Sequence, residues 1–283
     1  MDILLLNTLN GVSFGVVLFL IATGLSINMG LMRILNLAHG ALFLVAAYIG
    51  ISLLKRGENF LLASLIAAMV AGLIGLGMER GFLRRLHGKI SEQVLLTFGV
   101  MYVLTNTVQW IWGSRPMVAL APLSGSIAVG EFSFPIYRLV VVLIGLVAAI
   151  GLHIFQEKTR IGAIIRAGMD NKEMVMGLGI NFGLLCSAVF CFGAFIAGFA
   201  GLIGTPMMGV YPRVAVDVLL LALIVVVVGG MGSIPGALFS AILIGLLDAF
   251  GKVYFPSLGY FLIYLALIII LLIRPSGLMG RKI

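Results

Sequence analysis

Long apolar runs separated by short polar segments dominate the chain of 283 residues. A helix needs about 20 apolar residues to cross the hydrocarbon core of a bilayer. On this rule the pattern predicts nine candidate spans, at residues 4–28, 35–54, 60–79, 93–113, 135–155, 182–204, 215–231, 235–250 and 257–273. The runs are continuous, whereas the strands of a membrane β-barrel alternate in segments of about 10 residues, so a barrel is disfavoured.

Two pairs of neighbouring spans are separated by a single tight turn. The first turn is predicted at residues 28–33 and the second at residues 229–233. Each pair fits either two full crossings or a hairpin that re-enters the same side. The sequence therefore predicts an all-α polytopic membrane protein with seven to nine spans, folded as one transmembrane domain over residues 1–283.

The longest charged interruption of the apolar pattern covers residues 159–181. Ile161, Ile165 and Met169 recur there at helical spacing, and Gly177 and Gly179 then end the pattern. This spacing predicts a short amphipathic helix between two spans. On this pattern alone, a helix that docks on another protein and a helix that lies on lipid headgroups are equally good interpretations.

Composition excludes a soluble domain, because 62% of the residues are hydrophobic and only 10% are charged, against about 25% charged in soluble domains. The net charge of +8 does not indicate a nucleic-acid partner, since the basic residues fall in loops between spans. Twelve of the eighteen Lys and Arg residues lie at Arg33, in loops 80–92 and 156–181, and in the tail from Arg274. The positive-inside rule places these segments and the C-terminus in the cytoplasm and the N-terminus outside.

Motifs of enzyme chemistry are missing from the sequence. It contains no phosphate-binding loop, no HExxH motif and no nucleophile with a nearby base. We therefore expect no catalytic residue, metal or cofactor in this chain. Carboxylates deep in the spans, which ion-driven carriers use, are also missing, so energy for active transport would come from another polypeptide.

A few polar residues do enter the spans, and Asn10, Asn36 and His39 are our candidates for a translocation pathway. Asn36 and His39 lie three residues apart at a predicted helix start, so they share a face beside unpaired backbone N–H groups. The alternative for each residue is an interhelical hydrogen bond that only stabilises the bundle.

Four motifs carry a family resemblance. Residues 30–40 read GLMRILNLAHG, loop 160–180 contains Arg166-Ala167 and Asp170, residues 228–237 read VGGMGSIPGA, and residues 274–278 read RPSGL. Together and in this order they resemble the branched-chain amino acid ABC transporter permease family, specifically its LivH-type subunit. The match covers nearly the whole chain.

The resemblance implies a type II ABC importer permease with about eight transmembrane helices, embedded in the lipid of the bacterial inner membrane. It also implies three kinds of partner: a second related permease, two cytoplasmic ATPases and a periplasmic solute-binding protein. Loop 156–181 would then couple the permease to the ATPases. The candidate coupling residues are Arg160, Gly162, Arg166, Ala167, Asp170, Glu173, Gly177 and Gly179.

The function expected from the resemblance is import of branched-chain amino acids or similar small amphipathic solutes, driven by ATP hydrolysis on partner subunits. Urea or a short amide is the alternative solute, and a stand-alone facilitator or channel and a membrane scaffold are the alternative classes. Met174 and Val175 stand where many family members have alanines, so the matching groove of the ATPase is expected to be more apolar.

Overall fold

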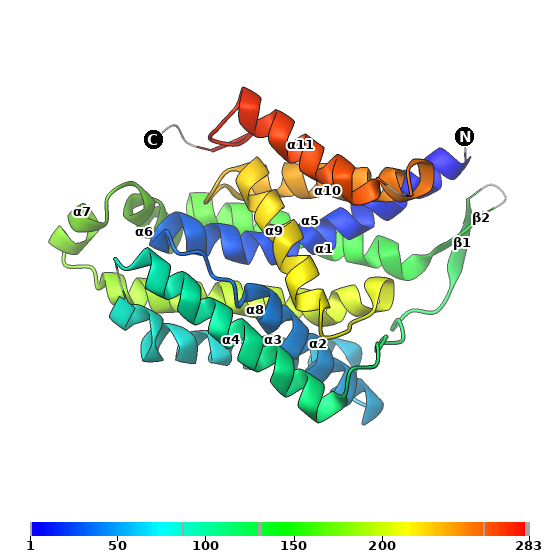
Figure 1. Ribbon diagram of the computed structural model, residues 1–283, viewed down its shortest axis with the longest axis horizontal. Helices are drawn as coiled ribbons and strands as arrows, with labels where there is room; N and C mark the ends of the chain where they lie inside the picture. Colours follow the sequence, from blue (N-terminus) through cyan, green and yellow to red (C-terminus); the bar gives the residue numbers. More distant parts are fainter. Residues whose placement is uncertain (1, 87, 130–131, 257, 281–283) are drawn as a thin grey trace.

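The computed structural model describes residues 2–86, 88–129, 132–256 and 258–280 (Figure 1). Its long helices are α1 (Asp2–Met32), α2 (His39–Lys55), α3 (Phe60–Gly81), α4 (Ile90–Trp112), α5 (Ile136–Lys158), α8 (Phe182–Met208), α9 (Val214–Gly229), α10 (Ile234–Tyr254) and α11 (Gly259–Ile273). Its short elements are η1 (Leu83–Leu86), β1 (Ser126–Val129), β2 (Phe132–Pro135), α6 (Arg160–Asp170) and α7 (Lys172–Gly177). The all-α fold class is confirmed, with one small hairpin added.

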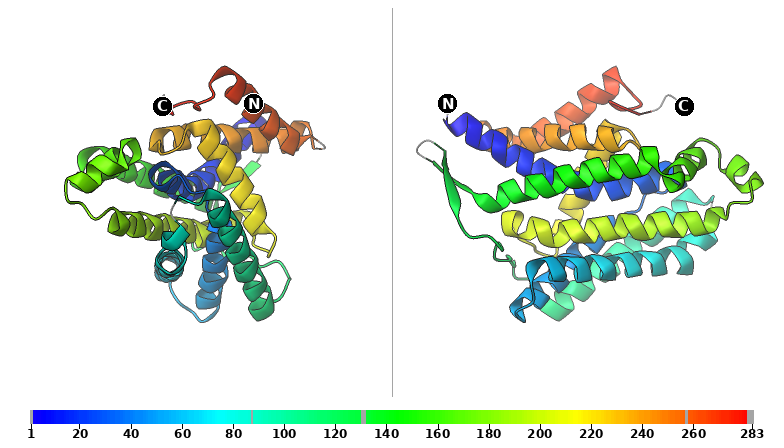
Figure 2. Two further views of the ribbon diagram at one scale, coloured as in Figure 1. Left: turned by 60° about the vertical axis from the view of Figure 1, so that its left-hand side comes forward. Right: turned by 180° about the vertical axis from the view of Figure 1, so that it is seen from behind.

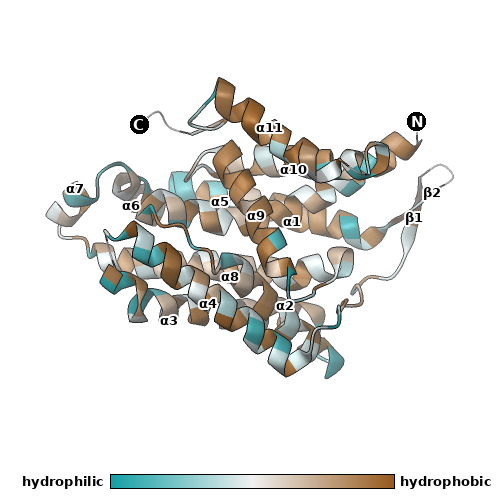
Figure 3. Cartoon of the chain, viewed as in Figure 1, coloured by the Kyte–Doolittle hydropathy of each residue, from teal (hydrophilic) through white to brown (hydrophobic). Residues whose placement is uncertain are grey.

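Each of the nine predicted spans overlaps a different helix, although spans 35–54 and 215–231 extend beyond the ends of α2 and α9. Among the described residues, α1, α3, α4, α5, α8 and α10 are long and apolar enough to cross a membrane, while α2, α9 and the described part of α11 are shorter apolar helices. Polar residues gather toward the ends of the bundle, whereas α9 and α11 are apolar almost throughout (Figure 3). The two termini lie at opposite ends of the bundle (Figure 1). Arg281 and Lys282 of the predicted basic tail lie outside the described residues.

The predicted turn at residues 28–33 is wrong, because α1 continues as helix to Met32. Asn28 and Gly30 suggested a break, yet both are accommodated inside the helix by close neighbours. Asn28 is 2% exposed and lies against Gly193 of α8, and Gly30 packs on the backbone of Gly232. The chain leaves the helix only at Arg33, whose φ of 53° is unusual for a residue other than glycine.

Helix starts follow from local polar residues that satisfy free backbone N–H groups. Asn59 accepts a bond from Leu61 N at the start of α3, and Asn181 accepts one from Leu184 N at the start of α8. Ser233 accepts a bond from Gly236 N at the start of α10. The last cap also fixes the turn predicted at residues 229–233, which joins α9 to α10.

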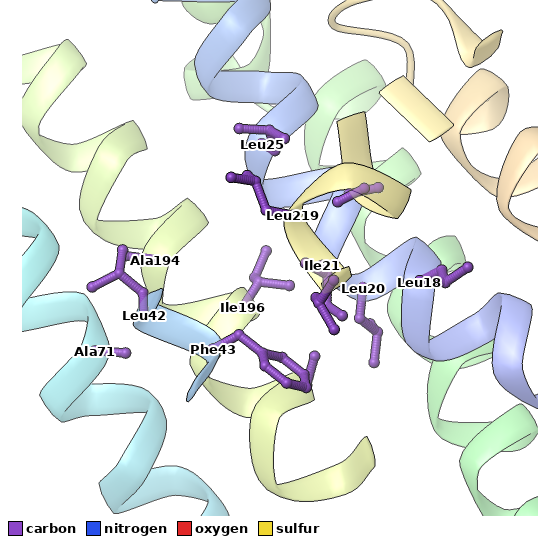
Figure 4. Packing of buried hydrophobic residues seen from close by; sticks show 14 of the residues in the cluster. Leu18, Leu20, Ile21, Leu25, Leu42, Phe43, Ala71, Ala194, Ile196 and Leu219 are labelled. Atoms are coloured by element: carbon purple, nitrogen blue, oxygen red, sulfur yellow. The ribbon is translucent and has the colours of Figure 1, made fainter. Parts of the chain in front are cut away.

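Helix α1 lies at the centre of the bundle, between α8 on one side and α9 and α10 on the other (Figures 1 and 2). Helix α3 packs along α8, α2 fits between α3, α8 and α9, and α11 packs mainly on α10. In the core, Leu42 and Phe43 of α2 lie among Ala71 of α3, Ile196 of α8 and Ile21 of α1 (Figure 4). All five side chains are buried.

Small residues let the central helices approach closely, as is common between membrane helices. Gly24 of α1 faces Gly193 of α8, and a Cβ built on Gly193 would lie 2.8 Å from the Gly24 carbonyl oxygen. A Cβ on Gly24 would overlap the backbone of Gly193 in the same way. Because backbone atoms cannot rotate aside, these positions admit no larger residue without moving a helix.

We expect Gly24→Ala to destabilise the purified protein by about 1–3 kcal/mol, the usual cost of overpacking a core. Gly77→Ala in α3 is the matched control, because a Cβ there would have no neighbour within 4 Å in the described part of the chain. Thermal unfolding in detergent measures both variants. Equal midpoints for the two alanine variants would contradict the close packing of α1 on α8.

Candidate functional site

The polar segment 159–181 folds as two helices, α6 and α7, which project from one end of the bundle (Figure 1). Thr159 Oγ1 accepts a hydrogen bond from Gly162 N and so begins α6, and Asn171 Oδ1 accepts bonds from Glu173 N and Met174 N and so begins α7. The single amphipathic helix predicted from the sequence is therefore divided at Asn171. Gly177 ends α7, and Gly179 follows with a φ of 80°.

Two of the candidate coupling residues hold α6 against α5. Gly162 is buried, and a Cβ on it would overlap the carbonyl groups of Phe155 and Gln156. Arg166 Nη1 lies 3.6 Å from Glu157 Oε2, and its Nη2 makes a long 3.5 Å contact with the Glu157 carbonyl oxygen. Both contacts fix the direction in which α6 leaves the end of α5.

The other candidate coupling residues are exposed, namely Arg160, Ala167, Asp170, Glu173, Gly177 and Gly179. Large apolar side chains are exposed beside them: Met174 is 68% exposed, Met176 48% and Leu178 74%. Val175, in contrast, is buried and anchors α7 to the bundle. The segment lies beyond the ends of the apolar helices. Its exposed surface is apolar and is flanked by charged residues. We call residues 160–179 the coupling segment.

Asn36 and His39 are both buried where the chain re-enters the bundle after α1. The connection at residues 33–38 runs back from one end of the bundle toward its middle (Figure 1). His39 Nε2 lies 2.9 Å from the carbonyl oxygen of Ile21, eleven residues before the end of α1 at Met32. Ile21 therefore lies about 17 Å along the helix axis from the end of α1. Because His39 contacts Ile21, α2 begins deep inside the protein.

The hydrogen bonds of Asn36 and His39 show which of their side-chain atoms remain available to bind a ligand. A carbonyl oxygen can only accept, so His39 Nε2 donates its proton to Ile21 and Nδ1 of the neutral ring is an acceptor. Asn36 Oδ1 accepts a bond from Ala38 N at 3.0 Å. Within the described residues, His39 Nδ1 and Asn36 Nδ2 have no hydrogen-bond partner, although both are buried. One acceptor and one donor are thus left at the start of α2.

The N-terminal turns of α2 and α9 meet beside this pair. A Cβ on Gly40 would overlap the carbonyl group of Ala215 and lie 3.0 Å from the Cβ of Leu219. Each helix carries a partial positive charge at its N-terminus. The region around Asn36 and His39 therefore favours a negatively charged group.

Asn10, the third candidate for the pathway, lies elsewhere. It occupies the first half of α1, where its Oδ1 accepts a hydrogen bond from Arg138 at the start of α5. Asn10 and Ile21 are eleven residues apart on one helix, which separates them by about 17 Å. The structure brings Asn36 and His39 together and leaves Asn10 at a different depth.

Residues 7–271 match the family described as "Branched-chain amino acid transport system / permease component". The chain belongs to this family. It is 29% identical to the high-affinity branched-chain amino acid transport system permease protein BraD of Pseudomonas aeruginosa over 96% of this chain and 94% of the relative. It is 28% identical to LivH of Escherichia coli over the same shares, and 25% identical to the probable permease LivH of Methanocaldococcus jannaschii over 93% and 88%.

A solved structure has a similar fold. The structure described as "PsaBC from Streptococcus pneumoniae in complex with Fab" superimposes with a TM-score of 0.52, covering 96% of this permease and 91% of that chain at 12% sequence identity. These findings confirm the family resemblance and the all-α permease fold expected from the sequence.

Several buried polar contacts of the permease were missed from the sequence. Gly232 N lies 3.0 Å from Ser26 Oγ, and Gln156 Nε2 donates to the Gly232 carbonyl at 3.0 Å. Ser187 Oγ donates to Glu79 between α8 and α3. The glycine-rich motif at residues 228–237 was the only signal for the first two contacts. The partners are too far apart along the chain for any local pattern to pair them.

Proposed function

We propose that this permease subunit translocates branched-chain amino acids or similar small amphipathic solutes, driven by ATP hydrolysis on partner subunits. The observation that carries the proposal is the buried pair Asn36 and His39 at the junction of α2 and α9. A free amino acid has a carboxylate that accepts hydrogen bonds and an ammonium group that donates them. Asn36 Nδ2 can donate to the former and His39 Nδ1 can accept from the latter.

The surroundings of the pair also suit such a solute. Helix N-termini that end inside the membrane bind anionic substrate groups in several transporter folds, and here α2 starts in the interior beside the first turn of α9. Apolar side chains are also buried close by, namely Ala38 just before α2, Leu42 in α2 and Leu219 in α9. An apolar side chain on the solute would therefore meet apolar protein.

The coupling segment supports the ATPase part of the proposal. Met174, Met176 and Leu178 expose apolar surface that the bundle does not cover, and exposed apolar patches of this kind mark protein or membrane interaction sites. In this proposal the coupling segment and loop 80–92 face the bacterial cytoplasm, with the C-terminus on the same side and the N-terminus outside. The ATPase subunits dock there, and a periplasmic solute-binding protein delivers solute at the opposite end.

Helix α4 supports a second permease subunit as partner. It is the least buried and least apolar of the six long helices among the described residues. Tyr102, Asn106 and Gln109 lie on one exposed face of α4, and the nearby Gly99 has no neighbour within 4 Å of a built Cβ in the described part of the chain. Amides facing lipid would be costly. A transmembrane helix of a related permease can satisfy them and pack closely on Gly99.

We expect the double variant Asn106→Leu/Gln109→Leu to weaken association with the second permease by about tenfold, since interhelical hydrogen bonds in membranes contribute about 0.6–1.7 kcal/mol each. Thr107→Leu is the matched control. The Thr107 hydroxyl uses its single proton on the Val103 carbonyl of its own helix at 2.8 Å. Asn106 Nδ2 also bonds within α4, to the Tyr102 carbonyl at 2.8 Å, but the amide keeps a second N–H and its Oδ1 for a partner. Co-purification of differently tagged subunits measures the association. An unchanged yield for the double variant would contradict the assignment of α4.

Solute uptake in proteoliposomes tests the proposal as a whole. Vesicles that contain the permease with its ATPases and binding protein are expected to accumulate leucine only when ATP is supplied. ATP-independent flux through the permease alone would instead indicate a facilitator, and no flux in either preparation would indicate a scaffold. Excess valine is expected to compete with leucine, whereas competition by urea and not by valine would move the solute class to amides.

A further inference from the structure

A cavity of about 470 Å³ lies behind the coupling segment. It is open to the outside and is lined by the end of α1, the start of α4, the α6–α7 junction and the start of α8, which converge at one end of the bundle (Figure 1). One wall is formed by Arg33 and the residues that lead into the 33–38 connection, and the facing wall is formed by residues 168–173 of the coupling segment. The cavity therefore connects the coupling segment with the connection that carries Asn36.

The charges of the described residues that line the cavity are balanced. Arg33 and Lys172 supply two positive charges, and Asp170 and Glu173 supply two negative charges. Gln93, 2% exposed, adds a buried amide, and Ile34 and Phe182 contribute apolar surface. A polyanionic headgroup or a free phosphate would meet two carboxylates here, which disfavours it. A small zwitterion with an apolar side chain matches both the charges and the apolar walls.

We propose that this cavity binds a zwitterion with an apolar tail, namely an amino acid of the transported class, from the side to which solute is released. The class of amino acid rests on the function proposed above. Arg33 holds the carboxylate, and Glu173 faces the ammonium group. Because the ligand bridges the end of α1 and the coupling segment, it restrains the movement of α6 and α7. Accumulated product thus slows further import.

Direct binding to the purified complex, reconstituted in nanodiscs of phosphatidylcholine and phosphatidylglycerol, tests the site first. Leucine is expected to bind in the millimolar range, since the charged groups are largely exposed and each contributes little. Leucinamide lacks the carboxylate and 4-methylpentanoate lacks the ammonium group, and each is expected to bind about two- to fivefold more weakly, the range for losing one exposed charge pair. Equal binding of all three compounds would overturn the proposal.

Phosphatidylethanolamine shares the chemistry of an ammonium group beside an oxyanion, so a lipid headgroup is the competing source. Adding this lipid to the nanodiscs is expected to leave leucine binding unchanged. If it abolishes leucine binding, the cavity is a lipid site and the proposal fails.

The decisive variant is Arg33→Asn, because asparagine tolerates the left-handed backbone at this position (φ 53°). Arg56→Asn is the control, since Arg56 is also exposed beyond a helix C-terminus but lies at the other end of the bundle. Leucine binding is expected to weaken about two- to fivefold in Arg33→Asn, the range for losing one exposed charge pair, and to stay unchanged in Arg56→Asn. Equal leucine affinities of the two variants would contradict the assignment of Arg33.

Uptake into proteoliposomes preloaded with leucine then tests whether leucine in the cavity slows further import. Each preparation is compared with its own uptake into empty vesicles, which separates the cavity from the transport proposal. Preloading is expected to slow uptake several-fold in the native complex and to have less effect with Arg33→Asn. Uptake that is normal in empty vesicles and insensitive to preloading would overturn the cavity proposal and leave the transport function intact. Failure of uptake in empty vesicles would instead count against the transport function.

Discussion

Replacing Arg166 with glutamate is expected to lower solute uptake by roughly tenfold while ATP hydrolysis continues. Arg166 lies 3.6 Å from Glu157, so the substitution puts two like charges between α6 and the end of α5. The repulsion moves the coupling segment away from the bundle. Conformational changes of the ATPases are then no longer transmitted to the transmembrane helices. A factor of this size corresponds to ~1–3 kcal/mol of coupling between sites. Parallel assays of ATP hydrolysis and leucine uptake in proteoliposomes measure it.

The charge-swapped pair Glu157→Arg/Arg166→Glu separates two roles of Arg166. If the residue positions α6, the pair restores uptake, because opposite charges again face each other. The side chain of Glu157 is 44% exposed and that of Arg166 is 22% exposed, so the swapped pair can form without burying an unpaired charge. A swapped pair as inactive as the single variant would mean that Arg166 itself contacts the ATPase. Normal uptake by the single variant would exclude Arg166 from coupling altogether.

Replacing His39 with leucine is expected to reduce uptake by at least about tenfold, which corresponds to a loss of ~1.4 kcal/mol. The substitution removes the acceptor Nδ1, which has no hydrogen-bond partner among the described residues, and it removes the donor to the Ile21 carbonyl. His39→Gln provides the matched comparison. A glutamine amide can still donate to Ile21 but does not reproduce Nδ1, so uptake is expected to stay low while thermal stability recovers.

The outcome of His39→Gln distinguishes a pathway residue from a packing residue. Removing one partner of a buried hydrogen bond costs about 1–3 kcal/mol, so His39→Leu alone could act by loosening α2 from α1. Full uptake by His39→Gln would show that transport requires only the hydrogen bond from residue 39 to the Ile21 carbonyl. In that case His39 would be a structural residue, and the pathway would lie elsewhere.

Hydropathy and charge were enough to predict the spans and the exposed segment between α5 and α8. These features depend on local composition, which is read directly from the sequence. The exact helix ends were predicted less well. The run from Asn28 to Arg33 looked like a turn, yet α8 and the turn before α10 cover Asn28 and Gly30 and keep α1 helical. Such compensation comes from residues more than 160 positions away and has no local signal.

For the candidate sites, too, the sequence predicts local groupings of residues but not contacts between distant parts of the chain. Asn36 and His39 were recognised as a pair because they lie three residues apart, and the structure places them together, although Asn36 precedes the helix rather than opening it. The pairing of Asn10 with Arg138 joins residues 128 positions apart, and the inward orientation of Gly162 and Arg166 depends on how α6 packs on α5. Neither arrangement follows from periodicity along the chain.

Photo-crosslinking from the coupling segment tests the central claim most directly. A photoreactive residue at Leu178, 74% exposed on the coupling segment, is compared with the same residue at Leu120, which is 89% exposed in the connection between α4 and β1. The assembled transporter is irradiated in membranes, and crosslinked partners are identified by mass spectrometry. We predict that position 178 crosslinks to an ATPase subunit and position 120 does not. Crosslinks from position 178 to lipid alone, with no ATPase adduct, would contradict the account.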